Sequence, residues 1–219
     1  MNAKYLKKII FVLLVLQSSV SIAQNEEGET NQISEYDTWN YGMTFTVQAG
    51  VWIPMGDLKK TFTSSPNLGF RFGVPVSESL RVDLGASINM PLDSKHFEYN
   101  DNGNRFLAKS EETINGILGV WLAQETRFNH RFIFSRYVGL GVGFIQTDTR
   151  KNDTEDENDE WFGVETLNIN FGLSINRIIT NKKAIGIFIE YNYAPYALFN
   201  KVEEGFGNRY VITGLQYRF

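Results

Sequence analysis

Apolar residues alternate with small or polar residues at a period of two in eight segments of the chain. In segment 167–176, every odd-numbered residue is large and apolar, whereas every even-numbered residue is asparagine, glycine or serine. Because successive side chains of a strand point to opposite faces, this alternation predicts eight β-strands, each with one apolar face. The predicted strands are 41–53, 67–76, 80–92, 113–127, 135–146, 167–176, 185–193 and 211–219.

The fourth segment is less regular than the others, because Ile117 and Trp121 fall on its polar side. The connections between the segments alternate in length, which is independent support for the strands. Transmembrane β-barrels of bacterial outer membranes have short turns at one end and longer loops at the other. The long connections are 54–66, 93–112, 147–163 and 195–208, and the shorter ones are 77–79, 128–134 and 177–183.

Alternation alone does not show which face points outward, since a soluble lipocalin-type barrel also has eight strands and an apolar interior. The lysines distinguish the two cases. A water-facing sheet normally carries charged residues, yet no predicted strand here contains a lysine. We therefore expect the polar face to line the interior and the apolar face to meet lipid. After residue 23 the lysines are at positions 59, 60, 95, 109, 151, 182, 183 and 201.

An unpaired strand edge in hydrocarbon leaves backbone groups without partners, so the last strand must pair with the first. The sequence thus predicts an all-β fold, an eight-stranded antiparallel up-and-down transmembrane β-barrel. Aromatic residues near the strand ends fit the girdles that such barrels place at the two lipid interfaces. These residues are Trp39, Tyr41, Trp52, Tyr137, Tyr191, Tyr193, Tyr196, Tyr210, Tyr217 and Phe219.

The first 23 residues have the features of a cleavable export signal. Three lysines precede the apolar run 9–16, and Ser21-Ile22-Ala23 forms a small-x-small cleavage site. The run is too short for a transmembrane helix, which needs about 20 residues. We expect a signal peptide at 1–23, a polar periplasmic lead-in at 24–40 and a barrel domain at 41–219.

Composition narrows the chemistry further. The chain has no cysteine, which excludes disulfides, thiolate chemistry and a lipid-modified N-terminal cysteine. Cleavage after Ala23 leaves 18 basic against 25 acidic residues, a net charge of −7. Nucleic-acid binding requires a basic face, so this balance argues against it.

The predicted interior contains ionisable residues of both signs in equal number. An eight-stranded interior is about wide enough to be filled by side chains, and buried charges persist when they are paired. We therefore expect a structural network of ion pairs; a gated path for protons or ions is the alternative. The predicted members are Arg71, Arg81, Arg127 and Arg218 with Asp83, Glu125, Glu165 and Glu190.

Catalytic and metal sites have little support in the sequence. The only histidines are His96, in a long connection, and His130, in a shorter one, and no nucleophile–base pair is recognisable. Glycines 139, 141 and 143 lie within a strand with no following helix, so they are no phosphate-binding loop. Segment 148–160 holds seven carboxylates, which could bind Ca²⁺, but it lacks the spacing of an EF-hand. We therefore expect a solvated acidic loop, no catalytic residue, no metal and no cofactor.

The fourth long connection, 195–208, contains Tyr196, Leu198, Phe199 and Phe206. Exposed aromatic residues on an outer loop could form a patch for a protein partner. They could equally continue the flanking strands above the membrane, and the sequence does not choose between these two readings.

Three segments, at 49–58 (AGVWIPMGDL), 136–143 (RYVGLGVG) and 214–219 (GLQYRF), resemble the small outer-membrane β-barrels of Gram-negative bacteria, the OmpA-, OmpX- and OmpW-like family. The resemblance covers about residues 41–219. It implies an outer-membrane location with both termini periplasmic. It also implies that Tyr217 and Phe219 belong to the signal that the barrel-assembly machinery reads.

Function follows less directly, because one fold serves many roles. We expect a non-catalytic structural or interaction role through the external loops, with outer-membrane lipids and lipopolysaccharide as surroundings and an extracellular or secretion-complex protein as a candidate partner. A narrow pore or a secretion-apparatus subunit is the first alternative. A lipid A-modifying enzyme that uses His96 is the second.

Overall fold

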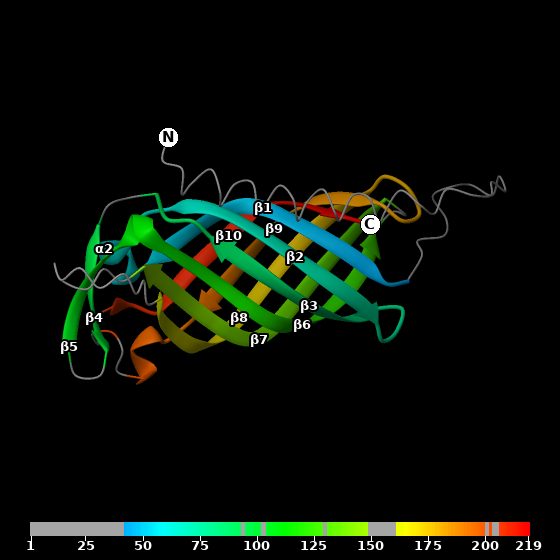
Figure 1. Cartoon of the computed structure of the whole chain (residues 1–219). Coiled ribbons are helices and arrows are strands. Elements are labelled where there is room, and N and C mark those ends of the chain that lie inside the picture. The colour runs from blue at the N-terminus through cyan, green and yellow to red at the C-terminus, as the bar shows by residue number, and fades with distance from the viewer. Residues whose placement is uncertain are drawn as a thin grey trace.

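The computed structural model describes residues 42–92, 95–101, 104–128, 131–148, 161–199, 202 and 206–219. Eight antiparallel strands close into a barrel in the order β1-β10-β9-β8-β7-β6-β3-β2 (Figure 1). This confirms the predicted fold. The barrel strands are β1 (Thr44–Met55), β2 (Ser65–Pro75), β3 (Leu80–Asn89), β6 (Thr113–Phe128), β7 (Phe132–Asp148), β8 (Trp161–Ile178), β9 (Ala184–Tyr193) and β10 (Arg209–Arg218).

The seam between the first and the last strand is fully paired. Its register runs from Thr46 opposite Arg218 to Met55 opposite Arg209. Beyond this register, the backbone N–H of Phe219 donates to the carbonyl of Phe45 at 2.9 Å, and the N–H of Phe45 donates to the carbonyl of Phe219 at 2.7 Å. The final residue therefore takes part in closing the barrel.

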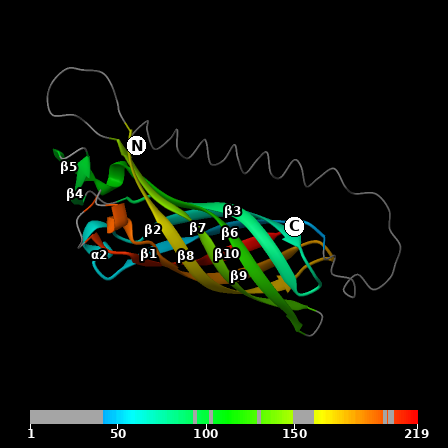
Figure 2. The ribbon, with the colours of Figure 1, turned by 90° about the horizontal axis from the view of Figure 1, so that it is seen from below.

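The two ends of the barrel differ. The start of β1 and the end of β10 lie at the same end as the short connections, which we call the turn end. The opposite end, the loop end, carries the long connections, as Figure 2 also shows. The elements of the loop end are α2 (Leu58–Thr61), the hairpin of β4 (His96–Asp101) and β5 (Asn104–Lys109), η2 (Ser110–Glu112) and η3 (Tyr196–Phe199).

The predicted faces agree with the structure. In β8 the side chains of Leu167, Phe171 and Ile175 are exposed on the outside, and Asn168 and Asn170 are buried inside. The irregular residues Ile117 and Trp121 do point inward, where both are buried. The sequence missed the β4–β5 hairpin and the short helices. It predicted β7 and β8 too short at both ends, and it continued the third strand to residue 92, although β3 ends at Asn89. Among the described residues, no helix is long and apolar enough to cross a membrane.

Candidate functional site

Four charged side chains form an ionic cluster inside the barrel near the turn end. Arg81 binds the carboxylate of Asp83 with two hydrogen bonds, from Nε at 2.5 Å and from an Nη at 2.9 Å. Arg81 also pairs with Glu125, and Arg218 donates to the same Glu125 oxygen at 2.6 Å. The hydroxyl of Ser135 donates to Glu125 at 3.3 Å. Each charge in this cluster therefore has an opposite partner, which buried charges require.

A second ion pair lies deeper in the interior. Arg71, on β2, pairs with Glu190, on β9, and the side chains of both are almost fully buried. The guanidinium of Arg71 also lies 4.2 Å from the ring centroid of Trp121 and 4.6 Å from that of Tyr137. A cation over an aromatic face is attracted by the ring quadrupole, most strongly where water is excluded. Arg71 thus links four strands across the barrel.

Two glycines provide the space for these aromatic rings. A Cβ atom on Gly139 would stand 2.5 Å from the Trp121 ring, and one on Gly172 would stand 2.2 Å from the Tyr137 ring. Any other residue at these positions would displace a ring that packs on Arg71. The inward glycines of β7 and β8 therefore have a steric role.

Several amide side chains hydrogen-bond to one another across the interior. Gln48 donates to Gln216 at 3.1 Å, Gln216 donates to Asn176 at 2.7 Å, and Asn176 donates to Ser174 at 3.2 Å. This chain of hydrogen bonds connects β1, β10 and β8. Further bonds of this kind join Asn67 to Ser87 and Asn89, and Asn168 to Asn170 and Tyr210.

An apolar cluster, the cap, closes the loop end of the barrel. Phe62 lies at its centre, with ring centroids 5.5 Å from Trp52, 5.6 Å from Phe97 and 5.9 Å from Phe206. Gly207 has a left-handed φ of 96°, and its backbone approaches Leu58 so closely that a Cβ atom would clash with it. The buried members of the cap are Trp52, Leu58, Phe62, Phe97, Ala108, Tyr196, Val202, Phe206 and Tyr210.

The cap joins residues from three connections that are distant in sequence. They come from α2 and the residue that follows it, Phe62, from the β4–β5 hairpin and from the segment between β9 and β10. At the hairpin base, the Lys95 ammonium donates to the Lys59 carbonyl at 2.7 Å. Burial raises the pKa of the Tyr196 hydroxyl, so this group stays neutral within the cap.

Two cavities lined by described residues are small. One cavity, lined by Thr46, Arg71, Tyr137 and Gln216 among others, has about 10 Å³ of space. A second cavity of about 10 Å³ lies at the turn end, beside Arg81, Glu125 and Glu78. Each volume is about that of one water molecule. Around these two cavities the described interior is thus packed with side chains.

The structure places six of the eight predicted interior charges in the two ionic groups described above. Arg127 is half-buried on the inward side of β6, two residues beyond Glu125. Glu165 is a correction. Its side chain is exposed on the outer face of β8, because it has the same parity as Leu167 and not that of Asn168.

The candidates for chemistry do not assemble into a site. His96 is exposed at the start of β4, and His130 and residues 149–160 lie outside the described residues. Within the part of the chain that the structure describes, no group of three or more His, Asp or Glu residues is arranged to hold a metal.

The predicted aromatic girdle is partly wrong. Trp52, Tyr137, Tyr196 and Tyr210 are buried inside the barrel or in the cap. Of the others, Tyr191 and Tyr193 are exposed on the outer face, Tyr217 and Phe219 are half-buried, and Trp39 and Tyr41 lie outside the described residues.

Both readings of connection 195–208 are also wrong for its two described aromatic side chains. Tyr196 and Phe206 are neither an exposed patch nor strand residues, because they pack in the cap.

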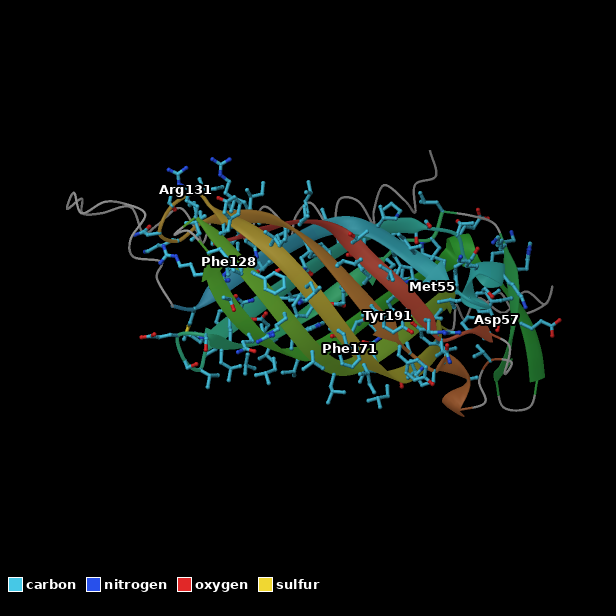
Figure 3. The ribbon with its side chains drawn as sticks, turned by 180° about the vertical axis from the view of Figure 1, so that it is seen from behind. Met55, Asp57, Phe128, Arg131, Phe171 and Tyr191 are labelled. Atoms are coloured by element: carbon cyan, nitrogen blue, oxygen red, sulfur yellow. The ribbon has the colours of Figure 1, made fainter. Side chains whose placement is uncertain are left out.

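The outer face carries a continuous apolar belt. Along β8 it runs from Leu167 to Ile175, between the exposed charges Glu165 and Arg177. The side chain of Phe171, at its middle, is 56% exposed (Figure 3). No lysine lies in a described barrel strand. The exposed face is therefore the apolar one, as predicted.

Comparison with solved structures identifies the fold. The structure is similar to Neisserial surface protein A (NspA), with a TM-score of 0.52 and 10% sequence identity over 80% of this chain and 93% of that one. Two further structures give TM-scores of 0.43. They are the N-terminal β-barrel domain of Pseudomonas aeruginosa OprF, at 11% identity over 81% of this chain and 98% of that one, and Ail of Yersinia pestis, at 12% identity over 81% of this chain and 96% of that one. Neither family models nor curated protein sequences give a match.

At this level of identity the likeness to NspA shows the fold alone. The chain has the fold of a small eight-stranded outer-membrane β-barrel. The resemblance seen in the sequence is thereby confirmed at the level of architecture.

Proposed function

We propose that this protein is an integral outer-membrane β-barrel that does not conduct solutes and acts through the surface at its loop end, without turnover chemistry. The observation that carries the proposal is the combination of an exposed apolar belt with a packed, polar interior. A soluble protein seldom exposes an apolar surface that encircles it, whereas a bilayer requires one.

The placement in the membrane follows from the same combination. A cleaved signal at 1–23 would deliver the chain to the periplasm, where the barrel-assembly machinery would insert it. With the short connections and the end of β10 in the periplasm, the loop end would face outward, among lipopolysaccharide. Both termini would then be periplasmic, and Tyr217 and Phe219 would provide the assembly signal.

Packing argues against the alternative of a pore. A conducting path would have to pass the cap at Phe62, then the Arg71–Trp121–Tyr137 stack, then the ionic cluster at Arg81. Because packed side chains lie above and around the ionic network, a structural role for this network is better supported than a role as a relay for ions.

Two measurements test the proposal. Purified protein should migrate faster on an unheated detergent gel than after boiling, as intact barrels do, and should require detergent to stay monomeric. A freely soluble monomer without detergent would overturn the membrane assignment.

Planar bilayers test the closed interior. Wild-type protein should give no stable conductance steps; steps that disappear in Glu190→Ala would favour the pore instead. A change in the lipid A mass spectrum on overexpression, lost in His96→Ala, would favour the enzyme alternative.

A further inference from the structure

Two polar side chains lie on the outer face of β6 and β7, in the half of the barrel nearer the turn end. Gln124 and Arg136 are exposed and are direct partners in the register of the two strands. The Nε of Arg136 donates to the amide oxygen of Gln124 at 2.9 Å. Among the described residues, no carboxylate forms an ion pair with Arg136. We call Gln124 and Arg136 the polar pair.

The register of the strands gives the height of the polar pair along the barrel axis. Followed from Leu80 around the barrel, the register returns to β3 at Met90, whose N–H donates to the carbonyl of Pro66 at 3.2 Å. One circuit therefore shifts the register by ten residues, which corresponds to a strand tilt of about 40° in a barrel of eight strands. At this tilt the height changes by about 2.5 Å per residue and by about 3 Å per strand. The successive partners on this path are Leu80, Gln124, Arg136, Leu173, Ile189, Thr213, Val51 and Pro66.

By this measure the polar pair lies within the height of the apolar belt. Relative to Leu80, Gln124 is about 3 Å and Arg136 about 6 Å nearer the loop end, whereas the last belt residue of β8 in that direction, Leu167, is at about 24 Å. Among the described outward side chains between the levels of Leu80 and Leu167, Arg136 is the only charged one. On the other six barrel strands, the level of the pair is occupied by Phe45, Phe72, Val82, Ile175, Ile187 and Tyr217.

The apolar belt is therefore lower on the side of β6 and β7. Its first apolar residues above the pair are Leu122, at about 8 Å, and Val138, at about 11 Å. Phe128 and Phe132 are exposed further out on the same hairpin, where aromatic rings form an interfacial girdle (Figure 3 shows Phe128). The polar pair thus indents the belt by about 6 Å from the turn end.

We propose that the polar pair draws lipid headgroups and water of the turn-end leaflet toward the middle of the membrane, and so thins the bilayer locally beside β6 and β7. A charged side chain that faces lipid is costly, and local thinning and water entry reduce this cost. A bilayer also adapts to a short apolar wall by becoming thinner. This inference rests on the membrane location proposed above.

The hydrogen bond within the pair sets the direction of the guanidinium group. Gln124 is nearer the turn end than Arg136, so the bond directs the Arg136 side chain toward that leaflet. Its two terminal amino groups are left for a lipid phosphate, which accepts such paired hydrogen bonds. A second copy of the chain, packed through the same face, would instead bring two guanidinium groups together.

The depth of nitroxide labels tests the proposal. Because the chain has no cysteine, one introduced cysteine takes a single label. Val138→Cys, beside Arg136 on β7, and Leu215→Cys, on β10, lie at the same height of about 11 Å, and both native side chains are exposed. The protein is folded into vesicles of phosphatidylethanolamine and phosphatidylglycerol, and depth is measured from collisions with oxygen and with a water-soluble nickel complex. The Val138 label should be shallower than the Leu215 label by at least about 4 Å, since the belt is indented by about 6 Å.

A variant that completes the apolar wall, Gln124→Leu with Arg136→Leu, should remove the difference between the two labels. Arg209→Gln is the matched control, because it removes an exposed guanidinium at the loop end of β10, and it should leave the difference unchanged. Equal depths of the two labels in the otherwise native chain would overturn the proposal, as would a difference that persists in the double leucine variant.

The same labels separate the other outcomes. Low collision rates of the Val138 label with both reagents would mean that another copy of the chain covers the pair, which would overturn the proposal as well. A Leu215 label that is not in contact with lipid would refute the membrane location itself. A deep Leu215 label beside an equally deep Val138 label would refute only the local thinning.

Discussion

Replacement of Glu190 by glutamine removes one charge from the interior and almost nothing of the side-chain volume. Arg71 is then left without its carboxylate partner, while Trp121 and Tyr137 still pack on its guanidinium. The amide of Asn192, which donates to Glu190 at 3.2 Å, keeps an acceptor in the glutamine side chain. The substitution therefore tests the buried charge pair itself.

The expected cost follows from burial. The side chains of Arg71 and Glu190 are 8% and 2% exposed, so water cannot replace the missing charge. Breaking a buried pair by removing one partner typically costs about 3–5 kcal/mol. Because the cation–π contacts and the Asn192 bond remain, we expect the lower end of this range, about 3 kcal/mol, in the free energy of unfolding.

Equilibrium unfolding in urea measures this quantity, with the barrel refolded into lipid vesicles and followed by tryptophan fluorescence. Trp121 lies beneath Arg71 and should report the loss directly. The double variant Arg71→Met, Glu190→Gln should lose less than the sum of the two single variants, because it leaves no unpaired charge. Asp57→Asn, which breaks the exposed Asp57–Lys60 pair, should leave the unfolding curve unchanged.

A loss below about 1 kcal/mol in Glu190→Gln would refute this reasoning, since that is the range of solvated pairs. Additive effects in the double variant would refute it as well. Either result would mean that water reaches Arg71 and that the interior is less tightly packed than the contacts indicate.

Three further predictions concern the belt, the interior and the seam. Phe171→Arg should destabilise the barrel by about 2–4 kcal/mol in vesicle unfolding, with Phe171→Leu as a mild control; equal effects would contradict the assignment of the belt. Gly172→Ala should cost about 1–3 kcal/mol because its Cβ meets the Tyr137 ring, and a smaller side chain in place of Tyr137 should restore part of this; no restoration would argue against a steric cause. Deletion of Phe219 removes both hydrogen bonds to Phe45 and should lower the yield of insertion in kinetic assays more than it lowers the stability of folded protein; the opposite order would contradict a role in assembly.

The alternation of apolar and polar residues along each strand predicted most of the architecture. Whether a residue is polar, and whether its number is odd or even within the strand (its parity), can both be read from the sequence. Trp121 is an example: its place on the polar side of 113–127 looked irregular, yet it points inward and packs on Arg71. Trp52 was assigned to the girdle from its position near a strand end, although its parity with Gln48 placed it inside. The same parity argument applied to Glu165 would have placed it outside.

Other features have no periodic signal. Pairing between Arg71 and Glu190 depends on the register of strands that are not neighbours in sequence or in the sheet. The cap depends on how connections of irregular structure fold over the mouth of the barrel, and alternation carries no information about them. Phe206 was therefore recognised as an aromatic loop residue, but its burial against Phe62 and Phe97 was not predictable.

Closure of the seam has a consequence for the order of folding. Three of the interior contacts join residues 93 positions apart at Arg218–Glu125, 119 apart at Arg71–Glu190 and 168 apart at Gln48–Gln216. Contacts of such long range form slowly, since much chain entropy is lost before any of them is made. Before β10 pairs with β1, Glu125 lacks one of its two arginine partners and one edge of β1 has no hydrogen-bond partners. A partly assembled barrel is therefore stabilised by few of these contacts. Folding should thus be a single late event that waits for the last strand to be available.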